Sequence, residues 1–144
     1  STALNSNYAN SAGTAIPIDD TVPQSTEGFS VVSATITPKS TTNKLRVRFT
    51  GSFAASAADN ISAAVFLNSE TSARASRYVS ANSGFATNIA IEFEFVPGIT
   101  TACTIAVRLG PSAGTTTVYI NGNTGGRLLG GSQNLQLVLE EIKA

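Results

Sequence analysis

Apolar and polar side chains alternate almost strictly along several short stretches of this chain. The alternation is clearest in residues 44–49, 89–96 and 103–109. A period of two directs one row of side chains toward a core and the other toward solvent, which is typical of a half-buried β-strand. The pattern predicts eight strands, which span residues 29–37, 44–53, 61–68, 74–80, 87–96, 103–109, 116–121 and 135–142.

Turn-forming residues separate the predicted strands. Residues 38–43, 57–60, 96–100 and 110–114 carry Pro, Gly, Asn, Asp or Ser, which favour tight turns. Short strands with such breaks favour an all-β fold, an antiparallel β-sandwich, with a jelly roll as the leading topology. One helical turn is the alternative in the Ala-rich residues 53–64.

The first 28 residues lack this alternation. Pro17 and Pro23 exclude a helix and a central strand, because proline has no amide donor and its φ is fixed. We expect residues 1–28 to form an irregular, extended arm laid against a sheet or a neighbouring chain, and residues 29–144 to form the sandwich domain. Ile16 and Ile18 are expected to dock as a short edge strand. Because the chain does not begin with Met, we expect a processed form or a fragment of a longer protein.

The end of the chain is the most patterned part. Residues 135–142 are expected to complete a sheet, with Leu135, Leu137 and Leu139 on one face and Val138 and Ile142 on the other. The Asn121-Gly122 pair predicts a hairpin turn, because both residues tolerate positive φ. Residues 122–131 are rich in Gly without phosphate-loop spacing and predict tight turns, with close chain packing near a trimer axis as one reason for so many glycines.

Charge is sparse in this chain. Only 12% of the residues are charged, and nine basic residues balance nine acidic ones, so no net field steers nucleic acid or holds an anionic membrane. No apolar run reaches the ~18–20 residues of a membrane-spanning helix. We expect no nucleic-acid partner and no membrane insertion. The mean hydropathy of +0.12 favours a surface partly covered by another subunit over a merely neutral surface.

The chain contains no His and a single Cys. Ser-His-Asp and Cys-His nucleophiles and His-based zinc sites are therefore excluded. Cys103 lies at an inward strand position and is expected to be a small buried hydrophobe. Asp19-Asp20 and Asp59-Asn60 lack EF-hand spacing and predict local Asx turns rather than a calcium site. We expect no enzyme activity, no cofactor and no metal.

Glu92 and Glu94 project from the same face of one strand, roughly 6.5–7 Å apart along the backbone. A catalytic carboxylate pair must flank a sugar across a cleft, which neighbours on one strand rarely do. We expect these residues to pair instead with Arg46, Arg48 or Arg108, either on an exposed face or inside a subunit interface.

Tyr78, next to Arg77, and Tyr119 are the candidate aromatic residues for binding. An aromatic face beside planar hydrogen-bonding groups suits a sugar ring. The predicted ligand-binding residues are Arg77, Tyr78, Asn82, Asn121 and Asn123. The competing interpretation is that the tyrosines pack in the core or in an interface, as strand tyrosines commonly do.

Several segments, taken in order, resemble C-terminal head domains of tailed-bacteriophage tail fibres and related virion proteins. Residues 16–28 resemble the segment that leads into such a head, and residues 36–45 resemble the hairpin that follows it. Similar pieces recur at residues 104–110, 121–122, 126–131 and 137–142. The resemblance covers about residues 16–142. It implies a trimeric β-sandwich head on a fibre, with receptor-binding or structural duties and no catalytic residues.

This resemblance leads us to expect a non-enzymatic domain on the surface of a virion. The expected partners are two further copies in a homotrimer, other virion proteins, and a bacterial surface glycan or protein receptor, which three weak sites would hold together. A purely structural role in capsid decoration, in a fibre cap or in trimerisation is the alternative. A free lectin-like carbohydrate-binding module is the third reading, and a glycan depolymerase is the remotest.

Overall fold

The computed structural model describes residues 1–11 and 14–144 and shows an all-β protein, as predicted. The eight predicted strands are all present, as β3 to β9 and β12, and their ends shift by at most two residues. The described strands are β1 (Thr2–Asn5), β2 (Ala9–Ser11), β3 (Phe29–Ile36), β4 (Lys44–Ala55), β5 (Asp59–Leu67), β6 (Ala75–Ala81), β7 (Thr87–Phe95), β8 (Cys103–Pro111), β9 (Val118–Ile120), β10 (Gly122–Asn123), β11 (Gly126–Arg127) and β12 (Leu135–Ile142). A single 3-10 turn, η1 (Leu129–Gly131), is the only helical element among the described residues.

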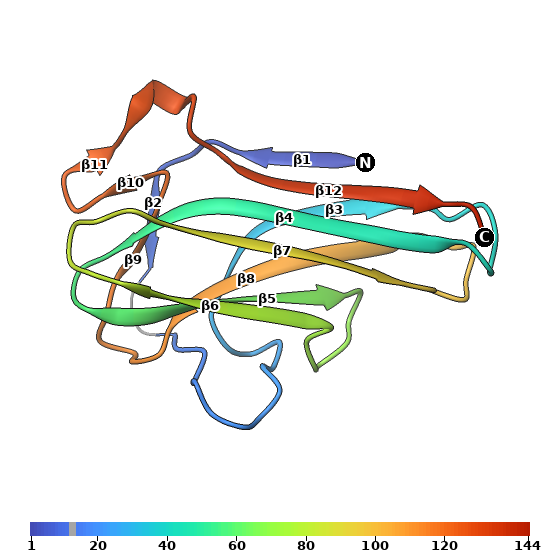
Figure 1. The fold of residues 1–144 in the computed structure, drawn as a ribbon, viewed down its shortest axis with the longest axis horizontal. Helices are drawn as coiled ribbons and strands as arrows, with labels where there is room; N and C mark the ends of the chain where they lie inside the picture. The colour runs from blue at the N-terminus through green and yellow to red at the C-terminus, as the bar shows by residue number, and fades with distance from the viewer. Residues whose placement is uncertain (12–13) are drawn as a thin grey trace.

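The strands pair as a long hairpin rolled into two sheets (Figure 1). Four nested antiparallel pairs join β1 to β12, β3 to β8, β4 to β7 and β5 to β6. The pairs β12–β4 and β8–β5 then close the roll. The first sheet therefore has β12 between β1 and β4, and β7 on the other side of β4. Beyond the end of β12, β9 pairs with β4, and β2 pairs with β9. The second sheet has the order β3-β8-β5-β6. This nesting is a jelly roll, so the predicted sandwich topology is confirmed.

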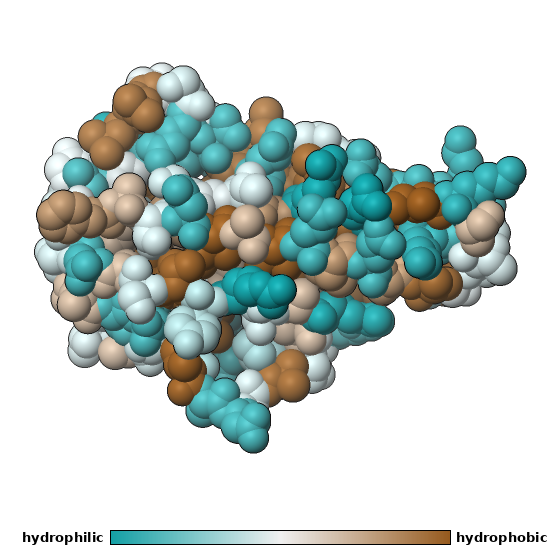
Figure 2. Space-filling view, viewed as in Figure 1, coloured by the Kyte–Doolittle hydropathy of each residue, from teal (hydrophilic) through white to brown (hydrophobic). Residues whose placement is uncertain are grey.

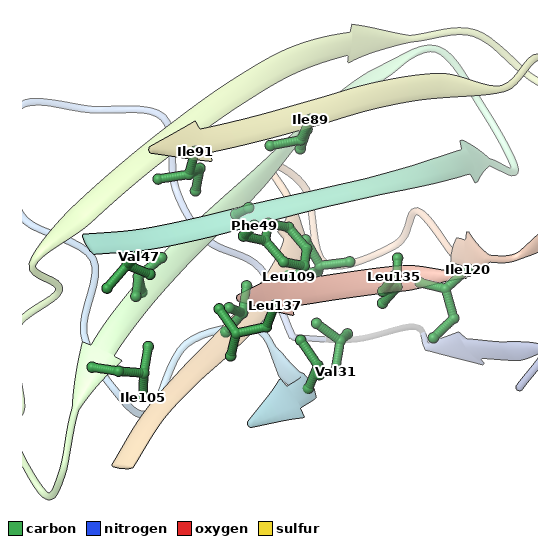
Figure 3. Packing of buried hydrophobic residues seen from close by; sticks show 14 of the residues in the cluster. Val31, Val47, Phe49, Ile89, Ile91, Ile105, Leu109, Ile120, Leu135 and Leu137 are labelled. Atoms are coloured by element: carbon green, nitrogen blue, oxygen red, sulfur yellow. The ribbon is translucent and has the colours of Figure 1, made fainter. Parts of the chain in front are cut away.

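The core lies between the two sheets and is filled by the inward rows that the alternation predicted (Figure 3). In β4, Leu45, Val47 and Phe49 are completely buried. The predicted inward face of the last strand, Leu135, Leu137 and Leu139, is at most 1% exposed. Cys103 belongs to the same cluster, and burial raises the pKa of its thiol, as expected for a small hydrophobe.

Residues 14–28, which we call the covering segment, lie across the outer face of the second sheet. Ile16 is 1% exposed and packs with Ala64 and Phe66 of β5 in a second small cluster. Its backbone amide donates to the carbonyl of Pro111 at 2.9 Å. The prediction of an edge strand at Ile16 and Ile18 is wrong: the segment forms no strand there, and Ile18 is 42% exposed. The segment is held by the buried Ile16 side chain and by isolated backbone contacts such as the Gln24–Ser72 bridge, and not by a continuous ladder.

The side chain of Arg108 holds the far end of the covering segment. Its Nε donates to the carbonyl of Glu27 at 2.6 Å and its Nη2 to the carbonyl of Gly28 at 2.7 Å. Pairing of Arg108 with Glu92 or Glu94 was therefore a wrong prediction, because β8 belongs to the second sheet and the two glutamates to the first. Arg108 satisfies two backbone carbonyls that the turn at Gly28 leaves without a strand partner.

The N-terminal residues are more regular than their sequence predicts. β1 pairs with β12, and β2 pairs with β9, so the irregular arm predicted for residues 1–28 is wrong at these positions. The Ser1 ammonium also donates to the carbonyl of Leu139 at 2.7 Å. Strands this short are stabilised by hydrogen bonds to the neighbouring strand and not by an alternation of apolar and polar residues of their own. The sequence pattern therefore did not reveal them.

Two local expectations near turns also fail. The helical turn expected in residues 53–64 is replaced by the end of β4, a bend and the start of β5, and Ala54, Ala55, Ala63 and Ala64 are fully buried strand residues. Gly122 lies in β10 and not in a turn, and the hairpin bends at residues 124–125. Asn121 has the left-handed φ of 56° that the pair was expected to supply. Tight turns in residues 122–131 are confirmed.

Asp59 ties the start of β5 to the loop after β8. Its carboxylate accepts from the amides of Asn60 at 2.7 Å and Ala113 at 3.2 Å, and from the hydroxyl of Ser112. Burial alone would raise the pKa of Asp59, but these hydrogen bonds outweigh it and hold that pKa below the usual 3.8. The predicted Asx turn at this position is not observed, because the Asp59 carboxylate accepts from the next amide and from the loop after β8, and not from the amide two residues on.

This arrangement predicts acid sensitivity. Because the pKa of Asp59 is lower in the folded state, its contribution to stability is complete above pH 3.8 and is lost as the pH falls through the lowered value. We expect Asp59→Asn to be less stable than the wild type at neutral pH and to lose less stability on acidification below 3.8. Urea midpoints measured across that range test this. Asp20→Asn is the control, and equal acid slopes for Asp59→Asn and wild type would contradict the prediction.

Candidate binding site

Tyr78 stands on the outer face of the second sheet, where β6 is the edge strand. It is directly opposite Ser62 of β5, and Ser76 is its neighbour on the same face of β6. The Tyr78 side chain is 60% exposed, unlike Tyr8 and Tyr119, whose rings stack on each other 6.4 Å apart. Packing therefore explains Tyr119, as the competing interpretation held, but it does not explain Tyr78.

The covering segment passes close to Tyr78 and leaves a shallow hollow. We call it the Tyr78 hollow; its volume is about 160 Å³. Ser62 lies in it and is only 5% exposed. The lining includes Ile18, Asp19 and Thr21 of the covering segment and Ser62, Ser76, Arg77 and Tyr78 of the sheet. This volume is well below the ~300 Å³ of the smallest typical ligand pockets, so the hollow suits one ring or one side chain.

Arg77 belongs to the opposite face of β6, because successive strand residues alternate. Its register partner, Ala63, is a core residue. Arg77 nevertheless remains exposed, since β6 is at the sheet edge, and its Nη1 donates to the carbonyl of Ser76 at 3.0 Å. The guanidinium therefore turns back toward the rim of the hollow. The structure brings the predicted pair Arg77 and Tyr78 into one site.

The three predicted asparagines do not line the Tyr78 hollow. Asn82 is exposed at the start of the β6–β7 loop, four residues beyond Tyr78. Asn123 caps its own turn, where its Oδ1 accepts from the Gly125 amide at 2.8 Å, and its carbonyl accepts from the Tyr8 hydroxyl at 3.0 Å. Asn121 is fully buried, so its side chain does not reach the surface.

Asn121 instead connects the end of β9 to the N-terminal residues between β1 and β2. Its Nδ2 donates to the carbonyls of Asn5 and Asn7, both at 2.8 Å, which fixes the link between β1 and β2. Its Oδ1 is buried without a hydrogen-bond partner. The Asn121 side chain therefore stabilises the fold.

Sequence reasoning missed the polar residues that the covering segment adds. The Asp19 carboxylate accepts from the amide of Thr21 at 2.8 Å and from its hydroxyl, which confirms an Asx turn. These bonds, the hydroxyl first, lower the pKa of Asp19, so its carboxylate stays ionised at neutral pH. Asp19 and Ser62 come close to Tyr78 through the pairing of β5 with β6 and the path of the covering segment. The periodicity of the sequence predicts neither of these.

A group of charged residues pairs on the outer face of the first sheet, where hydrophilic side chains lie over β4 and β12 (Figure 2). Arg46 contacts Glu94 at 2.6 Å, and Arg48 contacts Glu140 at 3.2 Å. Pairing of the glutamates with Arg46 is thus confirmed. These side chains are one-third to two-thirds exposed, and exposed pairs add little stability because water and salt screen them.

Apolar side chains project from loops at one end of the sandwich. Phe85 is 73% exposed in the β6–β7 loop, and Leu129 is 74% exposed in η1. Leu129 also has a φ of 54°, which is uncommon for a bulky residue. Beside it, Leu128 is 42% exposed. Apolar surface of this kind suits contact with another protein.

The described residues contain no group of three or more His, Cys, Asp and Glu side chains placed to hold a metal ion. That part of the chain also offers no helix with the length and hydropathy of a membrane span.

Comparison with known proteins gives similarity to solved structures. No protein-family model and no curated protein sequence matches the chain. A solved structure, that of infectious bursal disease virus strain Gx, aligns with a TM-score of 0.38 and 15% sequence identity. The alignment covers 96% of this chain and 37% of the viral chain, so this chain spans little more than a third of that protein's length.

Proposed function

We propose that this domain is a non-enzymatic component of a virus particle that attaches the particle to a host surface through the Tyr78 hollow. The observation that carries the proposal is Tyr78 itself, an aromatic ring 60% exposed on a rigid sheet beside a polar hollow. Binding residues on a sandwich act best when a rigid scaffold positions them. The ordered resemblance of residues 16–142 to phage fibre heads supports placing the domain on a virion.

The proposed assembly is a homotrimer. A shallow hollow binds weakly on its own, and three copies on one particle would raise the overall affinity through effective concentration. The sparse charge and the exposed leucines of η1 support contacts between copies or with other virion proteins. Light scattering should give a mass of three copies of 14.8 kDa. A monomer at micromolar concentration would overturn this assembly.

A purely structural role is the second candidate, and the exposed Phe85, Leu128 and Leu129 favour it. These residues would then pack against other virion proteins and the Tyr78 hollow would have no ligand. Substituting them would weaken assembly without affecting any interaction with cells.

Attachment is tested with the fluorescently labelled chain and a panel of bacterial strains. We expect saturable binding to at least one strain, and loss of that binding in Tyr78→Ala. Phe85→Ala is the matched control, because it removes an exposed aromatic ring at another place. Flow cytometry measures binding, and light scattering verifies that each variant keeps its assembly. If no strain in a broad panel binds the wild type, the structural role becomes the better explanation.

A further inference from the structure

The exposed ring of Tyr78 offers an apolar face beside the hydroxyl groups of Ser62 and Ser76. The face of an aromatic ring is electron-rich and attracts polarised C–H groups. Such a face on an exposed sheet favours a flat ligand that presents C–H bonds on one side. Ile18, which lines the same hollow and is 42% exposed, widens the apolar contact.

The polar groups of the hollow match a ligand with several hydroxyls. Among the described residues, no hydrogen bond engages the hydroxyls of Ser62, Ser76 or Tyr78. Some hydroxyls elsewhere on this sheet are paired, as between Ser80 and Asn60 and between Thr35 and Thr104, both at 2.9 Å. Each free hydroxyl both donates and accepts, and the ionised Asp19 adds an acceptor. A polyhydroxylated ring satisfies such a mixed set better than a purely apolar or purely anionic group.

The charges around the hollow argue for a neutral ligand. Asp19 and Arg77 both line it and carry opposite charges. One N–H group of Arg77 already donates to the carbonyl of Ser76. The carboxylate of Asp19 would repel an acidic group of the ligand placed nearby. An acidic sugar would therefore be attracted by Arg77 and repelled by Asp19.

From these features we infer that the Tyr78 hollow binds a single ring of a neutral carbohydrate, stacked on Tyr78 and hydrogen-bonded to Ser62, Ser76 and Asp19. The inference rests on the proposed attachment function and names its ligand class. A volume of about 160 Å³ accommodates one ring and not an enclosed chain, so the rest of a glycan would extend over the surface.

The test uses the full chain and a glycan array, followed by calorimetric titration with the methyl glycosides of glucose, galactose, mannose and N-acetylglucosamine. We expect at least one neutral glycan to bind. Tyr78→Ala should weaken that binding by about tenfold or more, because the stacking surface is lost. Tyr78→Phe, which keeps the ring, should bind within about threefold of the wild type, and Phe85→Ala should match it.

The binding measurements can overturn the inference in two ways. In the first, Tyr78→Ala, shown by circular dichroism to be folded, binds the neutral glycans as well as the wild type. In the second, only acidic glycans bind, and Arg77→Ala abolishes their binding. Periodate oxidation of cell-surface sugars separates this inference from attachment: if the chain still binds oxidised cells, attachment stands and the carbohydrate ligand is wrong. If untreated cells do not bind and the array is also negative, both proposals fail.

Discussion

A chain that ends at Ser132 is expected not to fold. The deletion removes β12, which lies between β1 and β4 and pairs with both. It also removes Leu135, Leu137 and Leu139 from the core, where each is at most 1% exposed. Among the described strands, β12 is the only partner of β1, which would be left unpaired, and one edge of β4 would lose its partner over Lys44–Thr50. Unpaired edges of this length promote aggregation.

Single substitutions test the same strand with finer control. Leu137→Ala should lower the free energy of unfolding by about 2–5 kcal/mol, because it leaves a cavity between the sheets. Val138→Ala changes the adjacent residue, which is only half-buried on the outer face, and should have a much smaller effect. Urea unfolding measures the free energy of unfolding of both variants, and circular dichroism shows whether the truncated chain folds. A soluble, cooperatively unfolding chain of residues 1–132 would show that the sandwich does not depend on β12.

Substitution of Asn121 is expected to have the second largest effect. Asn121→Ala removes both donors to the carbonyls of Asn5 and Asn7. Because these two hydrogen bonds are only partly buried, each loss should cost about 1 kcal/mol, the low end for an unpaired carbonyl. Alanine in the left-handed conformation adds about 1–2 kcal/mol. The total loss of stability should be about 3–4 kcal/mol.

Asn121→Gly separates the two contributions. Glycine adopts the φ of 56° freely but supplies no amide group, so its deficit relative to the wild type reports mainly the lost hydrogen bonds. Asn82→Ala is the exposed control and should be nearly neutral. Chemical denaturation of all three gives the comparison. A loss below about 1 kcal/mol for Asn121→Ala would mean that water replaces the amide at the two carbonyls.

The sandwich could be predicted because its strands alternate. Residues 44–55 and 135–142 pack one row of side chains inside, and a period of two is visible without knowledge of their partners. β1 and β2 escaped detection because strands of three or four residues depend on their partners' ladders. The path of the covering segment could not be predicted either, because it depends on distant contacts of Ile16 and on the guanidinium of Arg108.

The candidate site could be predicted only in part. Tyr78 was identified because a strand tyrosine beside Arg77 and turn asparagines is visible in the sequence. The asparagines were misplaced around it, since Asn121 and Asn123 lie beyond β9 and not beside β6. Asp19 lies 59 positions from Tyr78 in the chain, and only folding brings the two into one hollow. A sequence pattern carries no information about such distant neighbours.

The pairing of the first strand with the last gives the domain a polarity. Ser1 lies beside Leu139, and both labelled termini lie toward the same end of the sandwich (Figure 1). The β6–β7 connection and the β10–β11 hairpin lie at the other end (Figure 1). A stalk, tag or neighbouring domain fused to either terminus would therefore leave from one pole. The opposite pole would point away from whatever carries the domain, and the outer face of the second sheet, which holds the Tyr78 hollow, would form one flank of the domain.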